Sequence, residues 1–238
     1  MSVDTLFEHA GLRGDFVFDA AVAAVFPDML RRSVPGYPAI INMLTVLAER
    51  HAQAGSNLYD LGCSLGAAAQ ALDAGLTVDG CRIVAIDAAP AMVDRARAGL
   101  ALRRARLDLR CADMRDEPIH NASMVVLNFA LQFVPPAQRL AVLSRVREGL
   151  LPGGVLVLSE KVRGVDAAQD DLWTALHHAF KRANGYSDLE IARKRRALEN
   201  VLLPETLAAH EARLSQAGFR RVDGWFQCFN FVSLIAAV

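Results

Sequence analysis

The sequence lacks an excess of charge of either sign. Its 238 residues include 26 Lys and Arg and 26 Asp and Glu, so the formal net charge is zero. Proteins that bind nucleic-acid backbones depend on an excess of Lys and Arg, so this balance argues against a dedicated nucleic-acid binder while allowing a local basic patch. Hydrophobic residues make up 53% of the chain and charged residues 22%, a composition that excludes intrinsic disorder.

Long apolar runs and paired cysteines are also missing. No run approaches the roughly 20 residues of a membrane helix, and acids stand near the N-terminus where a signal peptide carries basic residues. The cysteines show no C-x-x-C spacing, which predicts buried, reduced thiols rather than a zinc site or disulfides. They are Cys63, Cys81, Cys111 and Cys228. We therefore expect a cytoplasmic globular protein with no membrane segment and no bound metal.

Strand-like and helix-like segments alternate through the middle of the chain. Short apolar segments at 57–61, 82–87, 107–113, 123–129 and 154–160 are expected to be strands. Helix-compatible stretches lie between them at 65–74, 91–104 and 136–150. Nearly continuous apolar strands that alternate with helices predict a parallel sheet covered on both faces.

The flanking regions are expected to complete a single α/β domain over residues 1–238. Residues 1–56 read as two helices separated by a turn around Pro35, Gly36 and Pro38. Residues 57–160 form the core of the sheet, and residues 161–205 form a polar helical cap inserted after the fifth strand. Residues 206–238 hold a helix that ends at Gly218 and two further strands, which can close the sheet as a hairpin.

Acidic residues follow three successive predicted strands. Asp60 is followed by Gly62 and Gly66, which let the backbone approach a ligand closely before a helix begins. The N-terminus of that helix offers free N–H donors to an anionic group. Asp87 ends the second strand, where an acid can accept both ribose hydroxyls. Asp113 follows the third strand, where an acid can accept the exocyclic amine of adenine, and Asp60 would favour an ammonium group.

This pattern resembles class I S-adenosylmethionine-dependent methyltransferases, whose fold is a Rossmann-like, mostly parallel α/β sheet with helices on both faces. A nicotinamide dehydrogenase would show G-x-G-x-x-G instead. An enzyme that uses another nucleotide, with purely structural glycines, is a further alternative.

Longer stretches resemble one family within that class, the carboxy-S-adenosyl-L-methionine synthases. They include VAAVFPDMLRRSVPGY, YDLGCSLGAA, NASMVVLNFALQF, LVLSEK, HHAFKRANGYSDLEI and WFQCFNF. The resemblance implies that S-adenosyl-L-methionine and prephenate become carboxy-S-adenosyl-L-methionine and phenylpyruvate. It also implies a homodimer whose product a companion tRNA carboxymethyltransferase uses to make the 5-oxyacetic acid of wobble uridine. The chain itself need not bind tRNA.

The resemblance also assigns roles to individual residues. Arg195 pairs with the added carboxylate and is the expected catalytic residue, since a guanidinium can give a carboxylate two parallel hydrogen bonds. The other expected ligand-binding residues are Tyr37, Asp60, Gly62, Cys63, Ser64, Asp87, Ala88, Asp113, Met114 and Asn128. Ala88 departs from the polar asparagine that we expect in many family members, so its side chain can give no hydrogen bond to adenosine.

Other readings of these features stay open. The basic run 193–196 can be a solvated helix face, and at most two of its four side chains can point into one cavity. His177 and His178 are adjacent on a predicted helix and are not expected to serve the same site. The chain can also be a conventional methyltransferase acting on a small molecule or tRNA, which has no need of Arg195. A ligand-binding partner without activity is the third hypothesis.

Overall fold

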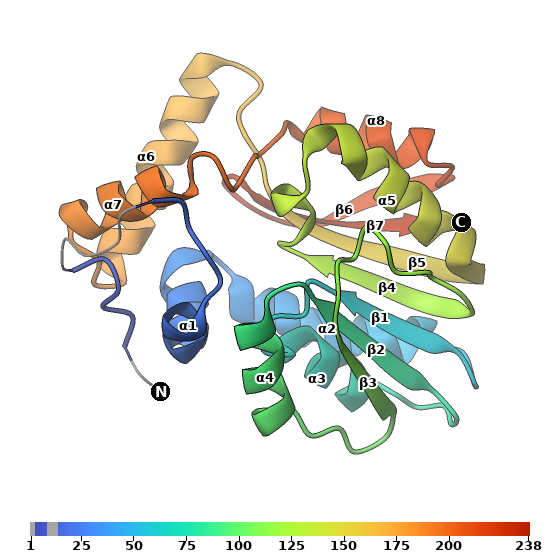
Figure 1. Ribbon diagram of the computed structural model, residues 1–238. Helices are drawn as coiled ribbons and strands as arrows, with labels where there is room; N and C mark the ends of the chain where they lie inside the picture. Colours follow the sequence, from blue (N-terminus) through green and yellow to red (C-terminus); the bar gives the residue numbers. More distant parts are fainter. Residues whose placement is uncertain (1–2, 9–13) are drawn as a thin grey trace.

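The computed structural model describes residues 3–8 and 14–238 (Figure 1). A seven-stranded sheet with the order β3-β2-β1-β4-β5-β7-β6 runs through it. The strands are β1 (Asn57–Leu61), β2 (Arg82–Asp87), β3 (Arg106–Cys111), β4 (Ala122–Asn128), β5 (Leu150–Lys161), β6 (Arg221–Cys228) and β7 (Phe231–Ala237). The helices are α1 (Ala20–Ser33), α2 (Tyr37–His51), α3 (Ala67–Ala74), α4 (Pro90–Gly99), η1 (Leu131–Phe133), α5 (Pro136–Gly149), α6 (Ala167–Ala183), α7 (Asp188–Leu198) and α8 (Leu207–Gln216).

The first five strands pair in parallel, and β7 joins β5 in the antiparallel sense. β6 pairs with β7 as an antiparallel hairpin. The five predicted strands and the closing hairpin are confirmed. Because β1 stands between β2 and β4, the strand order reverses at the middle of the sheet. Such a reversal opens a crevice at the carboxyl ends of the two central strands.

Helices cover both faces of the sheet, as its continuous apolar strands predict. On one face, side chains of β1, β4 and β5 such as Leu58, Met124 and Val157 pack with α2 and α3. On the other face, alternate side chains of the same strands, such as Leu127 and Leu158, pack with α5 and α8. The opposite orientation of successive strand residues explains why nearly all positions in the middle of these strands are buried.

Three helix boundaries differ from the sequence prediction by two or more residues. α8 ends at Gln216 rather than at Gly218. α3 begins at Ala67 rather than at residue 65, because Gly66 precedes it in a left-handed conformation with φ +84°. α4 ends at Gly99 rather than near residue 104. Asp73 holds the following loop in an open path, since its carboxylate accepts hydrogen bonds from the backbone N–H groups of Arg103, Arg104 and Ala105 at 2.7 to 3.0 Å.

The helical region that leaves the sheet after β5 consists of α6 and α7, which lie beside α1 (Figure 1). Pro38 does not interrupt a helix, because it lies in the first turn of α2, where no intrahelical hydrogen bond is lost. No helix within residues 3–8 and 14–238 is long and apolar enough to cross a membrane.

The prediction that all four cysteines are buried is wrong. Cys63 and Cys81 are buried, Cys228 is half-buried, and Cys111 is exposed. Cys111 is the last residue of the edge strand β3 and lies beyond Leu107 and Leu109, which pack against the core. All four thiols are free.

Candidate active site

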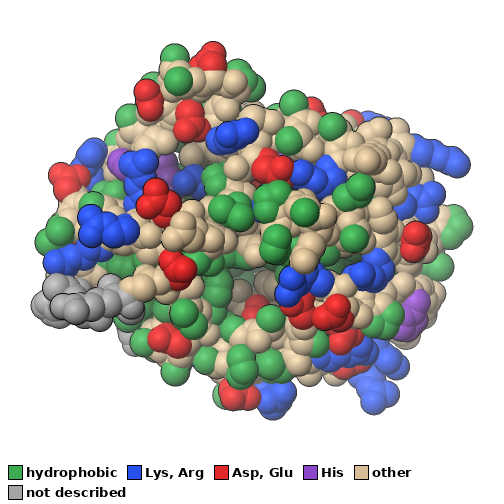
Figure 2. Space-filling view, turned by 45° about the horizontal axis from the view of Figure 1, so that its top comes forward, with side chains coloured by type: hydrophobic (Ala, Val, Ile, Leu, Met, Phe, Trp, Pro, Cys, Tyr) green, Lys and Arg blue, Asp and Glu red, His purple; other side chains and the backbone are tan. Residues whose placement is uncertain are grey.

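A cavity of about 970 Å³ opens at the carboxyl ends of β1, β2, β4 and β5. Its walls also include residues of α1, α6 and α7, so the helical region forms its outer side. Figure 2 shows a hollow on this face of the molecule with hydrophobic side chains around it. The cavity therefore lies at the reversal of strand order, where an open α/β sheet binds its ligand.

The loop between β1 and α3 forms one wall of the cavity. Gly62 has φ +77°, and a Cβ atom there would lie 2.5 Å from the Cβ of Ala130. The backbone N–H of Ser64 donates to Asp87 Oδ2 at 2.8 Å, and that of Ala89 donates to Oδ1 at 2.9 Å. Asp87 thus fixes the loop while each carboxylate oxygen keeps a lone pair for a ligand. Burial raises the pKa of Asp87, and the two hydrogen bonds from the backbone lower it by a smaller amount.

Replacing Gly62 by alanine is expected to displace this loop. The added methyl group clashes with Ala130. The alanine must also adopt a left-handed backbone conformation, which only glycine adopts without strain. We expect a loss of about 1 to 3 kcal/mol in the free energy of unfolding. Urea denaturation measures it. Gly14→Ala is the control, since a Cβ there meets nothing within 4 Å while φ is also positive. An equal loss in both variants would contradict the steric explanation.

Asp60 lies at the end of β1 and is fully buried against the cavity. Its Oδ2 accepts a hydrogen bond from the backbone N–H of Ala69 at 2.9 Å. Burial raises the pKa of Asp60 to about 7, and the charge of Asp87 adds to the rise. Tyr37 lines the same cavity, and its pKa is raised by burial and by the charge of Asp60. Asp60 has no cationic partner in the part of the chain that the structure describes, and a ligand ammonium can supply one.

Two buried amide oxygens in the cavity wall have no hydrogen-bond partner among the described residues. They are Oδ1 of Asn128, at the carboxyl end of β4, and Oδ1 of Asn230, between β6 and β7. Buried polar atoms are almost always paired, so such atoms in a cavity wall mark contacts reserved for a ligand or water.

A smaller cavity of about 340 Å³ adjoins the first, and both are lined by Asp87, Ala88 and Met114. Asp113 lines the smaller one. Its carboxylate is already bound by Arg115, whose Nη2 lies 2.6 Å from Oδ2, and this pairing lowers the pKa of Asp113. The residues predicted to bind adenine, Asp113 and Met114, therefore lie in one cavity with Asp87. The carboxylate of Asp113 is paired with Arg115.

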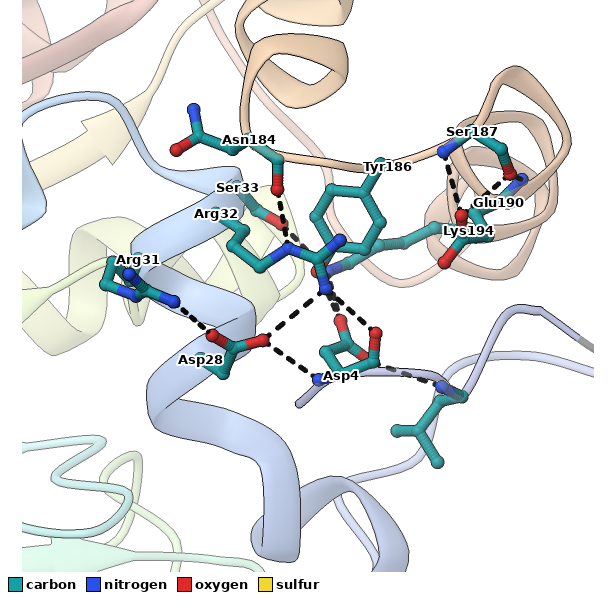
Figure 3. A network of polar contacts seen from close by, with 11 residues as sticks. Asp4, Asp28, Arg31, Arg32, Ser33, Asn184, Tyr186, Ser187, Glu190 and Lys194 are labelled. Atoms are coloured by element: carbon teal, nitrogen blue, oxygen red, sulfur yellow. Dashed lines mark hydrogen bonds and ion pairs between the residues drawn. The ribbon is translucent and has the colours of Figure 1, made fainter. Parts of the chain in front are cut away.

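The helical region positions Arg195 at the cavity. Of the basic run 193–196, Lys194 and Arg195 line the cavity, which confirms that at most two of the four can do so. Lys194 is buried, and its Nζ donates to Ser33 Oγ at 2.9 Å and lies 3.6 Å from Asp4 Oδ2 (Figure 3). This pairing joins α7 to α1. The side chain of Arg195 makes no hydrogen bond or ion pair with any residue that the structure describes.

The segment before α1 strengthens this attachment (Figure 3). The hydroxyl of Tyr186 donates to the Asp4 carboxylate, and the backbone N–H of Asp4 donates to Asp28 at 2.9 Å. Arg32 donates to the carbonyl oxygens of Asp4 at 2.9 Å and Asn184 at 2.7 Å. Residues far apart in the sequence thereby hold α6 and α7 in place over the cavity.

The geometry of the two adjacent histidines gives His177 a structural role, since it is buried and packs against Phe231. His177 and His178 both line the cavity, with ring centroids 6.5 Å apart, because the cavity is wide enough to meet a broad face of α6. His177 Nε2 lies 2.8 Å from the carbonyl oxygen of Ser33. Burial and then the charges of Lys181 and Lys161 lower the pKa of His177 to about 2, so its ring is neutral. The pKa of His178 is lowered too, first by burial.

Cys63 lines the cavity from the loop between β1 and α3. Burial raises the pKa of its thiol, and the nearby Asp60 and Asp87 raise it further. A protonated thiol is a poor nucleophile. Within the described ranges, no group of three or more His, Cys, Asp or Glu side chains is arranged to hold a metal ion.

The cavity residues that the sequence analysis missed include Lys161, Lys181 and Asn230. Lys161 ends β5, in line with the acids that end β1 and β2, so a polar residue after a buried strand was a usable signal. Lys181 and Asn230 carried no local signal, because only the packing of α6 and of the β6–β7 turn brings them to the cavity.

The fold and the position of the cavity define a class. Residues 58–154 match a family model described as "Methyltransferase domain". The chain superposes on the methyltransferase SibL in its apo form with a TM-score of 0.61 at 18% identity, covering 97% of this chain and 64% of that one. For human N-acetylserotonin methyltransferase in complex with SAM, the TM-score is 0.59 at 16% identity, with 92% and 55% covered. The fold is that of the class I S-adenosylmethionine-dependent methyltransferases, as the sequence predicted.

Closer relatives narrow the class to one family. A carboxy-S-adenosyl-L-methionine synthase of Trichlorobacter lovleyi is 56% identical over 225 residues, 93% of this chain and 92% of the relative. One of Escherichia fergusonii is 53% identical over 236 residues, 98% and 96% of the two chains. This chain belongs to the carboxy-S-adenosyl-L-methionine synthase family.

Proposed function

We propose that this protein converts S-adenosyl-L-methionine and prephenate to carboxy-S-adenosyl-L-methionine, phenylpyruvate and water. The observation that carries the proposal is Arg195, a guanidinium without a partner in the described part of the chain, at a cavity that also holds Asp60 and Asp87. A cation beside a reactive methyl group would repel the sulfonium of a conventional methyl donor. It is useful where the substrate or product carries a carboxylate at that place.

The chain's residues fit S-adenosyl-L-methionine. Asp87 has lone pairs free for the ribose hydroxyls, and the cavity shared by Ala88 and Met114 can receive adenine. Asp60 can pair with the ammonium group of the ligand. Gly62 lets the loop pack directly against Ala130, and Asn128 Oδ1 in the cavity wall lacks a partner among the described residues.

The atoms of the proposed reaction balance without an oxidant or a metal. The ring carboxyl group of prephenate leaves as carbon dioxide, its ring hydroxyl leaves, and the ring becomes aromatic. The sulfonium methyl group loses one proton, which departs with that hydroxyl as water. The carbanion next to the positive sulfur then forms a bond to carbon dioxide. The protein's part is to hold both molecules in contact and to stabilise the anionic carboxyl group through Arg195.

The same proposal includes the product's use. Carboxy-S-adenosyl-L-methionine would serve a companion tRNA carboxymethyltransferase that modifies wobble uridine. The enzyme would be a cytoplasmic homodimer that does not itself bind tRNA, in keeping with the zero net charge.

Mass spectrometry of the protein incubated with S-adenosyl-L-methionine, with and without prephenate, tests the proposal. We expect a prephenate-dependent species heavier than the substrate by one carbon dioxide, together with phenylpyruvate. Absence of this species, with S-adenosylhomocysteine and a methylated acceptor formed on addition of cell extract, would show a conventional methyltransferase. Carboxylation only in the presence of another protein would show a binding partner.

The affinity for S-adenosyl-L-methionine is expected to fall as the pH falls below 7. The pKa of Asp60 is raised to about 7, so the carboxylate is progressively protonated below that pH and no longer attracts the ligand's ammonium. One such group weakens binding at most about tenfold per pH unit. Calorimetric titration from pH 8 to pH 5.5 measures the dependence. In Asp60→Asn it should disappear, and an unchanged pH profile in that variant would remove Asp60 from ammonium binding.

A further inference from the structure

The part of the cavity formed by β5, α6 and α7 is strongly cationic. Four side chains of its lining form what we call the cationic cluster: Lys161, Lys181, Lys194 and Arg195. The lining also contains two acids near them, Asp170 and Glu199, and both are exposed. His177 and His178 add no charge near neutrality, because their pKa values are lowered. Positive charge therefore exceeds negative charge in this part of the cavity.

One member of the cluster is already neutralised. Lys194 has Ser33 and Asp4 as partners, as described above (Figure 3). Its role is to attach α7 to α1, and it has no free charge to offer to a ligand. Lys161, Lys181 and Arg195 remain.

Lys181 is buried without compensation. Its side chain is on α6 with 6% of the residue exposed, and its ammonium makes no hydrogen bond or ion pair with the residues at 3–8 and 14–238. Burial, and then the charges of Lys194 and Lys161, lower the pKa of Lys181 to about 7. A cation that faces a cavity with no acid to offset its charge is available to an anionic ligand, so its place in the cavity wall indicates an anion that binds there.

Lys161 supports the same reading from the sheet. Its backbone N–H donates to Gln132 Oε1 at 3.1 Å, which fixes the residue at the carboxyl end of β5. Its ammonium has no ion pair with a described acid within 4 Å. Burial lowers its pKa, the charge of Arg195 lowers it further, and Asp170 opposes the shift. Lys161 and Lys181 line the same cavity as His177, whose pKa both of their charges lower.

The cavity-facing side of α6 is polar along its length. Asp170, Thr174, His177, His178 and Lys181 line the cavity at helical spacing. A helix that faced a packed core would place apolar residues at these positions. This face of α6 is therefore built for a polar ligand rather than for packing.

We propose that Lys161 and Lys181 form an anion subsite for the second carboxylate of the co-substrate, the one that is retained in the keto acid product. This assignment rests on the proposed function and deepens it. Prephenate carries two carboxylates. Arg195 would pair with the one that is transferred, while the two lysines hold the pyruvyl carboxylate. Asp60 and Asp87 suit the ammonium and ribose groups of S-adenosyl-L-methionine. The acidic end of the cavity therefore favours S-adenosyl-L-methionine, and the cationic end favours prephenate.

Equilibrium binding of phenylpyruvate in the presence of S-adenosyl-L-methionine tests the subsite, because phenylpyruvate retains only the pyruvyl carboxylate. Lys181→Met and Lys161→Met should each weaken phenylpyruvate binding about 10- to 100-fold, the loss of one charged hydrogen bond. Arg195→Ala should change it by less than about threefold, well below the loss of such a bond. Arg182→Met is the matched control, since Arg182 is next to Lys181 on α6 but is exposed and paired with Asp188.

Wild-type protein gives a second test that needs no folded variant. An anion at Lys181 restores its proton, so binding of phenylpyruvate near pH 8 should take up protons from solution. Calorimetry in two buffers of different ionisation enthalpy measures this uptake. Binding without proton uptake would overturn the role of Lys181.

The outcomes separate this proposal from the function on which it rests. If both lysine variants bind phenylpyruvate as Arg182→Met does, or lose S-adenosyl-L-methionine to the same degree, the subsite is overturned even though the wild type forms carboxy-S-adenosyl-L-methionine. If the wild type forms none while the lysine variants still lose phenylpyruvate selectively, the proposed function fails and a keto-acid subsite is established.

Discussion

Arg195→Ala is expected to abolish carboxylation and spare binding of S-adenosyl-L-methionine. The guanidinium can give two charged hydrogen bonds to a carboxylate, so its removal should lower kcat/KM for carboxy-S-adenosyl-L-methionine formation about a thousandfold. Within the described residues Arg195 supports no other side chain, so the Kd for S-adenosyl-L-methionine should stay within about threefold of the wild type, less than one charged hydrogen bond. The preference for the carboxylated form should disappear.

Steady-state kinetics and titration with both sulfonium compounds measure these effects. Arg196→Ala is the matched control, because Arg196 is the next residue on α7, is exposed and does not line the cavity. Equal loss of affinity for S-adenosyl-L-methionine and its carboxylated form in Arg195→Ala would contradict the pairing of Arg195 with the added carboxylate.

Asp87→Ala is expected to weaken every adenosine ligand alike. The carboxylate holds the backbone of Ser64 and Ala89 and can accept two ribose hydroxyls. Loss of two hydrogen bonds to a charged group predicts that affinity falls about a hundredfold or more. The fall should be the same for S-adenosyl-L-methionine, its carboxylated form and S-adenosylhomocysteine, since all three share the ribose.

Calorimetric titration of the three ligands checks this prediction. Asp94→Ala serves as the control, because Asp94 is an exposed acid on the neighbouring helix α4 and is paired with Arg97. An unchanged affinity in Asp87→Ala would remove Asp87 from the ribose site, and a loss confined to the carboxylated ligand would place it elsewhere in the cavity.

The strands could be predicted from the sequence because their signal is local. Segments such as β2 and β4 are continuous apolar runs bounded by turns, which is typical of strands buried on both faces. Helix ends were less predictable. The end of α4 depends on Asp73, which accepts three hydrogen bonds from a loop 30 to 32 residues away. No local pattern near residue 100 indicates that contact.

The acid-bearing end of the candidate site could also be anticipated. Asp60 and Asp87 end neighbouring parallel strands, and the carboxyl ends of such strands meet at one edge of the sheet. The placement of Arg195 rested on resemblance, because its helix reaches the cavity only through long-range contacts of Lys194 with Ser33 and Asp4.

The place of Lys181 in the lysine subsite could not be found in this way. Lys181 stands in a charged helix that reads as solvent-exposed, and its neighbour Arg182 is indeed exposed. What buries one lysine and exposes the next is the docking of α6 against α1 and the sheet. The same docking brings both His177 and His178 to the cavity.

The measurement that tests the central claim most directly uses prephenate isotopically labelled at its ring carboxyl carbon, with unlabelled bicarbonate in the buffer. The product is analysed by mass spectrometry. If the carboxyl carbon passes directly between the two bound substrates, the label is found in carboxy-S-adenosyl-L-methionine. Phenylpyruvate is then formed in an equal amount. An unlabelled carboxylated product, or phenylpyruvate without it, would contradict the transfer of the carboxyl group within this cavity.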